Sequence, residues 1–229
     1  MYASQIDSHS FSFQVSGSLW RDALVMVDME TNSLWSHITG ESIFGEMENK
    51  VLNLFPSSLT TFAQFKKNYP NGKLLKKSEK GESGSGYKNY FANREKLGMF
   101  GRVDNFKRLK GKDKVVGIRI GFKQGAVSEK YLYQNQFAIL DNFEHAVLVT
   151  YDSAGNSFSA FSLADLTDEA ILKINLTGQT ITTSNQDLGW NAQTGNSRSG
   201  KIANLQPLPL TRSFWFAWAS FFPETELIN

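Results

Sequence analysis

Two stretches of the chain carry one pattern and decide how the fold is organised. Residues 35–45 read WSHITGESIFG and residues 190–200 read WNAQTGNSRSG, so that Trp, Thr, Ser and two Gly recur at the same spacing. Trp and Gly are hard to replace where packing or a positive φ requires them. The recurrence therefore indicates an internal duplication.

The match continues downstream with an offset that is shorter by two residues. Leu52 corresponds to Leu205 and Pro56 to Pro209, and each copy then has a short aromatic segment that ends at a proline. Aromatic residues at helical spacing predict a helix over residues 61–68 and another over about 213–222. We expect both helices to pack into a shared core, because neither has an extensive polar face.

Strand patterns fill the rest of both copies. Alternating apolar residues predict a half-buried strand over 11–16 that ends at Gly17, and turn residues at 30–33 predict a hairpin over 23–39. Further strands are predicted over 115–120, 146–151, 158–161 and 171–176. The sequence thus predicts a β-rich α+β fold of two related half-domains, residues 1–75 and 115–229, joined by a connector over 76–114 in one integrated domain.

The first copy is shorter at its front than the second. The strand-rich block of residues 115–151 has no counterpart before Tyr2. A sheet without those strands would expose an unpaired edge. We therefore expect either further residues before Met1 in the natural protein or self-association through the exposed sheet edge.

Composition excludes several classes of protein. Lys and Arg total 24 against 22 Asp and Glu, which argues against a broadly basic nucleic-acid-binding protein. The absence of cysteine excludes a disulfide scaffold, a thiolate zinc site and a cysteine nucleophile within this chain. No apolar run is long enough to cross a bilayer, and the polar start lacks the pattern of an export signal, so we expect a soluble chain.

The connector differs in composition from its surroundings. Residues 76–114 hold 12 Lys or Arg against 5 Asp or Glu, interleaved with aromatic residues. Such a mixture can bind phosphates and stack bases. The simpler interpretation, which we favour, is a solvated link between the two half-domains.

The densest group of polar residues surrounds the first copy's Trp. As catalytic candidates we take Asp28, His37 and Glu41, and as ligand-binding candidates Thr31, Ser33 and Trp35. On a strand, His37 and Glu41 would lie on one face and could share a proton or a metal ion. The alternative is a hairpin in which Asp28 and Thr31 hold the turn while Trp35 packs in the core. The second copy has Ala192 and Asn196 in place of the imidazole and the carboxylate.

Other chemistry has little support in the sequence. The three histidines, His9, His37 and His145, have no metal-binding spacing, so we predict no metal site. There is no Gly-x-Ser-x-Gly elbow, and the glycine-rich residues 81–86 lack the Gly-Lys-Ser/Thr of a phosphate-binding loop. The aromatic run over 214–222 is typical of a buried helix.

At family level the chain resembles known proteins. The motifs that carry the resemblance are FQVSG at residues 13–17, LVMVDMETNSLWSHITGE at 24–41 and FWFAWA at 214–219. They look like the bacterial and archaeal family catalogued as domain of unknown function 3179. Members typically have a Cys-Pro-Leu-Cys segment before the strand that matches residues 2–17, and this chain lacks it. The resemblance implies an envelope or exported protein, and an incomplete or inactive member if the cysteine pair is the working part.

Two functional hypotheses remain open from the sequence. One is a small-ligand-binding or enzymatic protein whose site lies in the first half around His37. The alternative is a non-enzymatic binding module that uses the basic connector, with Lys107, Arg108, Lys110 and Lys112 as its contact residues. The sequence names neither a cofactor nor a reaction.

Overall fold

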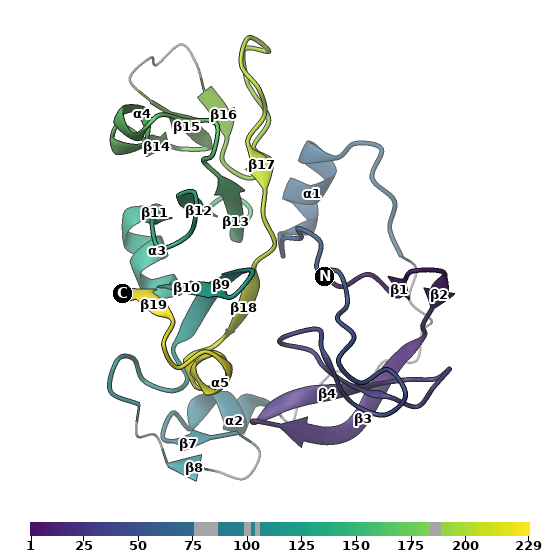
Figure 1. Cartoon of the computed structure of the whole chain (residues 1–229). Coiled ribbons are helices and arrows are strands. Elements are labelled where there is room, and N and C mark those ends of the chain that lie inside the picture. Colours follow the sequence, from purple (N-terminus) through teal and green to yellow (C-terminus); the bar gives the residue numbers. More distant parts are fainter. Residues whose placement is uncertain (76–86, 99–101, 104–105, 184–188) are drawn as a thin grey trace.

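The protein is built from several small, mostly antiparallel sheets and five short helices within the part of the chain that is described. A computed structural model describes residues 1–75, 87–98, 102–103, 106–183 and 189–229 (Figure 1). This architecture confirms the expected β-rich α+β class. The glycine-rich residues 81–86 lie outside the described residues.

The first half contains a four-stranded sheet in the order β3-β4-β5-β6. The strands of this sheet are β3 (Phe13–Trp20), β4 (Ala23–Asp28), β5 (Leu34–Ser36) and β6 (Ser42–Phe44). Before them, β1 (Gln5–Ile6) and β2 (His9–Ser10) form a separate two-stranded sheet. The hairpin expected over 23–39 is confirmed over residues 23–36, because Met26 of β4 pairs with Trp35 of β5, whereas residues 37–39 form a turn and not strand. The strand expected to stop at Gly17 instead continues to Trp20, since Gly17 adopts a φ of 78° within an irregular register between Val15 and Leu19.

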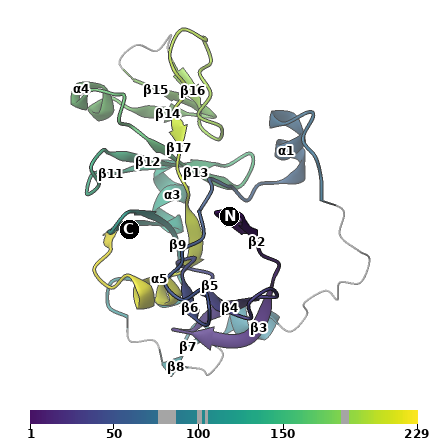
Figure 2. The same ribbon diagram turned by 45° about the vertical axis from the view of Figure 1, so that its right-hand side comes forward.

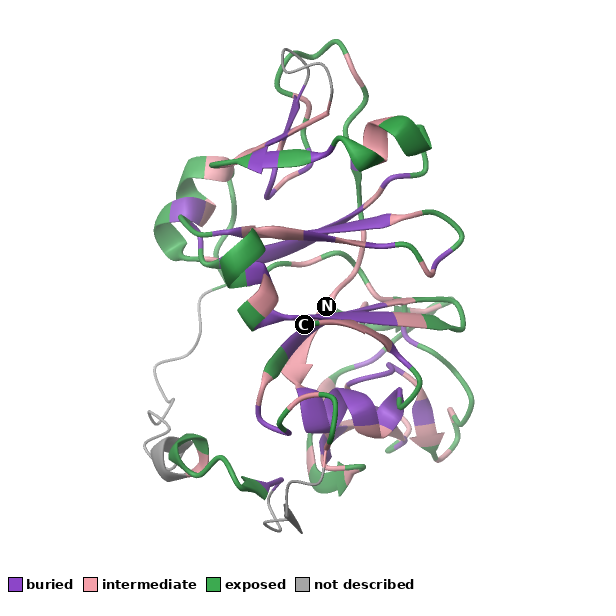
Figure 3. Ribbon diagram, turned by 90° about the vertical axis from the view of Figure 1, so that its left-hand side faces the viewer, coloured by how far each residue is buried: buried purple, intermediate pink, exposed green. Residues whose placement is uncertain are grey.

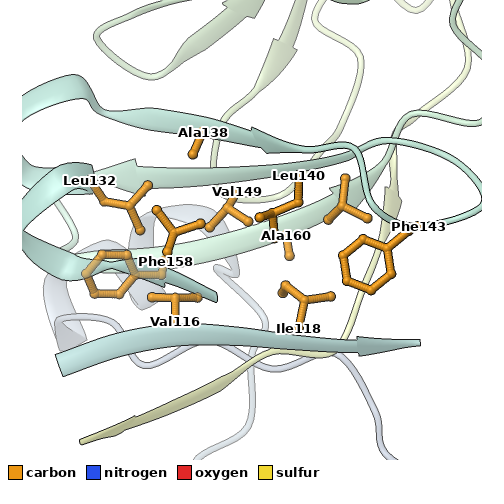
Figure 4. Packing of buried hydrophobic residues seen from close by; sticks show 11 residues of the cluster. Val116, Ile118, Leu132, Ala138, Leu140, Phe143, Val149, Phe158 and Ala160 are labelled. Carbon is orange, nitrogen blue, oxygen red and sulfur yellow. The ribbon is translucent and has the colours of Figure 1, made fainter. Parts of the chain in front are cut away.

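Two four-stranded sheets of the second half pack face to face. One has the order β18-β9-β10-β19 and the other β11-β12-β13-β17. Apolar side chains from both sheets, among them Val116, Ile118, Val149 and Phe158, fill the space between them (Figure 4). The strands are β9 (Lys114–Ile120), β10 (Lys123–Ser128), β11 (Phe137–Leu140), β12 (Val147–Asp152), β13 (Ser157–Ser162), β17 (Gln206–Pro207), β18 (Thr211–Phe214) and β19 (Glu226–Ile228).

Two helices in the second half begin at hydroxyl caps. The Ser128 hydroxyl caps α3 (Glu129–Asn135), and the Thr167 hydroxyl caps α4 (Asp168–Leu172). The strand expected over 171–176 is therefore wrong in its first half. Thr167 followed by two acidic residues is a helix start, and the strand β14 (Asn175–Thr177) begins only after it, to pair with β15 (Thr180–Thr182) and β16 (Gly189–Asn191).

The two aromatic helices have the expected positions and different surroundings. They are α1 (Phe62–Asn68) and α5 (Trp215–Phe221). Helix α5 buries Trp215 and Trp218 against Val115 of β9 and against Ala23 and Ile38 of the first half. Helix α1 buries only Gln64, so the expectation that both helices share a core is wrong for α1. Figure 3 shows the contrast: α5 is mostly buried, whereas α1 is mostly exposed.

The described part of the connector packs on the body of the protein. It contains α2 (Tyr87–Ala92), β7 (Lys96–Leu97) and β8 (Arg102–Val103). Lys112 donates to the carbonyls of Tyr90 and Asn93, and Arg108 donates to the carbonyl of Thr225 at 2.7 Å. Arg108 and Lys112 therefore hold backbone in place, whereas Lys107 and Lys110 are exposed.

The two Trp-x3-Thr-Gly turns have the same hydrogen bonds. The Gly40 N–H donates to the Ser36 carbonyl at 2.8 Å, and the Gly195 N–H donates to the Asn191 carbonyl at 2.8 Å. Both glycines have a positive φ, 73° and 72°. Common descent of the two halves stays a prediction from the sequence.

The shared core couples the halves, and a pair of isoleucines tests this. We expect Ile38→Ala to lower the free energy of unfolding by about 2–5 kcal/mol, because Ile38 of the first half is buried in the same cluster as the tryptophans of α5. Ile120→Ala, at a side chain that is 40% exposed, should cost about 1 kcal/mol or less. Urea unfolding measures both, and equal effects would contradict the shared core.

Candidate functional site

The group around Trp35 forms a buried turn. The Trp35 indole N–H donates to an Asp28 carboxylate oxygen at 2.7 Å, and the Thr31 backbone N–H donates to the other at 2.6 Å. The Ser33 hydroxyl contacts the Thr31 hydroxyl at 2.7 Å and accepts from the Met47 N–H. Asp28, Ser33 and Trp35 have no exposed surface. The structure thus brings four of the six candidates together, in the arrangement that holds the hairpin turn.

The Asp28 carboxylate is stabilised in its charged form. Burial by itself raises the pKa of this carboxyl, but the hydrogen bonds from Trp35 and Thr31 outweigh burial and lower the pKa below its usual value. A buried carboxylate with its oxygens already occupied is poorly placed to contact a ligand. Asp28 therefore acts as the anchor of the turn.

His37 and Glu41 have different partners. Strand β5 ends at Ser36 and the chain then turns through Gly40, so the alternation that would place both side chains on one face is lost. The Glu41 carboxylate lies 3.4 Å from the Arg119 guanidinium, which also donates to the Thr39 carbonyl at 2.6 Å. Glu41 thus links the first half to β9.

The hydrogen bond of His37 fixes which ring nitrogen carries a proton. The Nδ1 atom lies 2.9 Å from the Leu24 carbonyl oxygen. Because a carbonyl only accepts, Nδ1 must donate, and in the neutral ring Nε2 is then the acceptor. A neutral imidazole in this tautomer can accept a hydrogen bond or a proton from a bound molecule.

His37 lines a pocket of about 610 Å³ that spans the two halves and the connector. We name it the His37 pocket. Most of its lining is apolar, and the polar groups are few. The lining residues are Leu19, Asp22, Ala23, Leu24, His37, Ile38, Tyr90, Gly98, Arg212, Ser213, Phe214, Phe216 and Ala217.

A buried carboxylate holds the pocket's guanidinium in place. Glu129 of α3 pairs with Arg212 of β18 through two hydrogen bonds and also accepts from the Tyr133 hydroxyl at 2.7 Å. The bond to Glu129 raises the pKa of Arg212, so its charge is permanent. Burial, together with the Glu129 carboxylate, raises the pKa of Tyr133 to about 12. The guanidinium also lies over the Phe158 ring, with Cζ 5.1 Å from the centroid.

Sequence reasoning missed the contributions of the second half to this pocket. Arg212, Ser213 and Phe214 lie on β18, which follows the second Trp-x3-Thr-Gly motif by more than ten residues. The only signal was that the duplicated motif leads into an aromatic helix in both copies. Nothing in the spacing places β18 beside His37.

Neither a metal-binding cluster nor a membrane-spanning helix is found in the described ranges. Among those residues there is no group of three or more His, Cys, Asp or Glu that could hold a metal ion. No helix in that part of the chain is both long and apolar enough to cross a membrane.

Comparison with known proteins gives one match. The family model described as Protein of unknown function (DUF3179) matches residues 1–225, nearly the whole chain. No curated protein and no solved structure matches the chain.

The Asp28 turn predicts a specific pH dependence of stability. The folded pKa of Asp28 lies below its unfolded value, so the stabilisation is fully present above the unfolded value and is lost as pH falls through the folded value. Asp28→Asn should lower the free energy of unfolding by about 1–3 kcal/mol at neutral pH, and the difference from wild type should shrink as the pH falls below about 3.9, the ordinary pKa of an Asp carboxyl. Urea unfolding over this pH range measures it.

The control for this prediction is Glu144→Gln, at an exposed carboxylate. It should leave the pH dependence of stability almost unchanged. A constant difference between Asp28→Asn and wild type at every pH would show that the charge of Asp28 plays no part.

Proposed function

The chain belongs to the family described as Protein of unknown function (DUF3179), and we propose that its function is to bind a small, largely apolar molecule in the His37 pocket. The observation that carries this proposal is the contact between His37 Nδ1 and the Leu24 carbonyl, at the wall of a mostly apolar pocket. Pockets of about 300–1,000 Å³ with apolar walls and a few oriented polar groups are the usual form of small-molecule sites.

The polar groups of the pocket indicate the kind of ligand. His37 offers an acceptor at Nε2 once Nδ1 is occupied, and an acceptor selects a ligand with a hydroxyl or N–H donor. Arg212 is already neutralised by Glu129, so the pocket does not require an anionic ligand. An apolar body with one donor group fits these walls.

Of the candidate residues in the first half, this proposal retains His37, and it adds residues of the second half. The alternative of a binding module built on the connector is less favoured, because Arg108 and Lys112 are engaged with backbone carbonyls. Asp22 and Tyr90 also line the pocket, and we assign neither of them a role in a reaction with His37. The proposed role is therefore binding.

Binding of phenol and toluene distinguishes a pocket that offers a hydrogen-bond acceptor from a purely apolar pocket. The two have similar shape, and only phenol can donate to His37 Nε2. We expect phenol to bind about fivefold more tightly than toluene, which corresponds to a net hydrogen bond of about 1 kcal/mol. Nitrogen-detected NMR of the three histidines measures it: free His37 should show the Nδ1–H tautomer, and its Nε2 signal should move with phenol.

The chain supplies its own controls. His9 and His145 are exposed and should not respond to phenol. His37→Leu removes the acceptor with little change in volume, so it should abolish the preference for phenol while toluene still binds. If all three histidines respond alike, or if His37→Leu keeps the preference, the proposed site is wrong.

A further inference from the structure

Helix α1 is oriented opposite to what its sequence favours. It turns Gln64 inward, and Asn68 at its end donates to the Gln193 side chain of the second half. The Thr61 backbone N–H just before the helix donates to the Gly155 carbonyl at 3.0 Å. Of its aromatic residues, Phe62 is 61% and Tyr69 48% exposed, and Phe65 between them is half-buried. A surface helix ordinarily buries its apolar stripe and exposes its polar one.

Helix α5, which corresponds to α1 in the second half, shows that the duplicated sequence pattern does not by itself impose this orientation. The backbone at the N-cap of α5 is the same, with a φ of −70° at Phe214 against −68° at Thr61, although only Thr61 also caps its helix with its side chain. In α5, however, Trp215 and Trp218 are both buried. Aromatic side chains are thus buried on α5 but exposed at Phe62 and Tyr69 of the α1 segment.

Further exposed apolar side chains flank α1 in sequence. Phe55 is 56%, Leu59 72%, Leu74 64% and Leu75 98% exposed. Such a concentration of exposed apolar side chains in one segment is more typical of an interaction site than of ordinary surface. Both ribbon views place α1 at the periphery of the molecule (Figures 1 and 2).

The charge of this segment is of one sign. Residues 55–75 contain Lys66, Lys67 and Lys73 and no Asp or Glu. All three lysines are exposed. We name residues 55–75 the α1 surface; it combines exposed aromatic and aliphatic side chains with uncompensated positive charge.

We propose that the α1 surface attaches the protein to an anionic lipid bilayer. Phe, Tyr and Leu side chains next to lysines are the composition that lies at the boundary between headgroups and acyl chains, where the lysines meet anionic headgroups. A second copy of the chain fits less well. A twofold dimer would place this patch against itself, and the lysines of both copies would meet with no carboxylate from the segment between them.

Flotation of the full chain with lipid vesicles tests the proposal. We expect binding to vesicles of phosphatidylcholine with about 30% phosphatidylglycerol and little binding to phosphatidylcholine alone, since the lysines require anionic headgroups. Raising the salt concentration to about 0.5 M should weaken the binding. The double variants Phe62→Gln/Tyr69→Gln and Lys66→Gln/Lys67→Gln should each bind at least tenfold more weakly.

Controls separate this surface from exposed apolar residues in general. Phe122→Gln/Leu172→Gln changes two side chains that are 100% and 85% exposed elsewhere, and it should bind as wild type does. Circular dichroism and thermal melts confirm that each variant is folded, which their exposed positions favour.

Three outcomes would overturn the proposal. They are equal binding to neutral and anionic vesicles, equal binding by the α1-surface variants and wild type, and no vesicle binding at all. In the last case light scattering shows whether the α1 surface instead forms a dimer that Phe62→Gln/Tyr69→Gln disrupts.

Discussion

The packing of Trp218 against the bare Cα of Gly117 is the contact on which the rest of the structure depends. A Cβ at Gly117 would occupy the space of the indole ring, so only glycine lets α5 approach β9 this closely. The helix then lies between the second half's sheet and Ala23 and Ile38 of the first half. One close approach thereby makes a single core out of segments nearly 200 residues apart.

The His37 pocket is a consequence of that arrangement. Its walls come from the hairpin of the first half, from β18 and α5 of the second, and from Tyr90 of the connector. Glu129, from yet another element, holds Arg212 at its edge. A pocket at the junction of independently positioned elements is where small molecules are usually bound, because such junctions leave concave space between rigid walls.

The two copies of the Trp motif show how one local structure serves two roles. The turn hydrogen bonds are the same in both, whereas the indole of Trp35 donates to Asp28 and that of Trp190 to the Ala203 carbonyl at 2.7 Å. His37 follows the first Trp, and Ala192 occupies the corresponding place in the second. The shared residues maintain the turn, and His37, at one of the positions that differ, lines the pocket.

Local chemistry in the sequence determined the fold class, the hairpin around Trp35 and the positions of α1 and α5. Turn residues, alternation and helix-terminating prolines act between neighbours, so they can be read from the chain alone. The placement of Arg212 beside the first half, the different partners of His37 and Glu41 and the exposure of Phe62 and Tyr69 at α1 were decided by tertiary structure. Each depends on which distant surface packs against an element, and periodicity within that element carries no information about its partner.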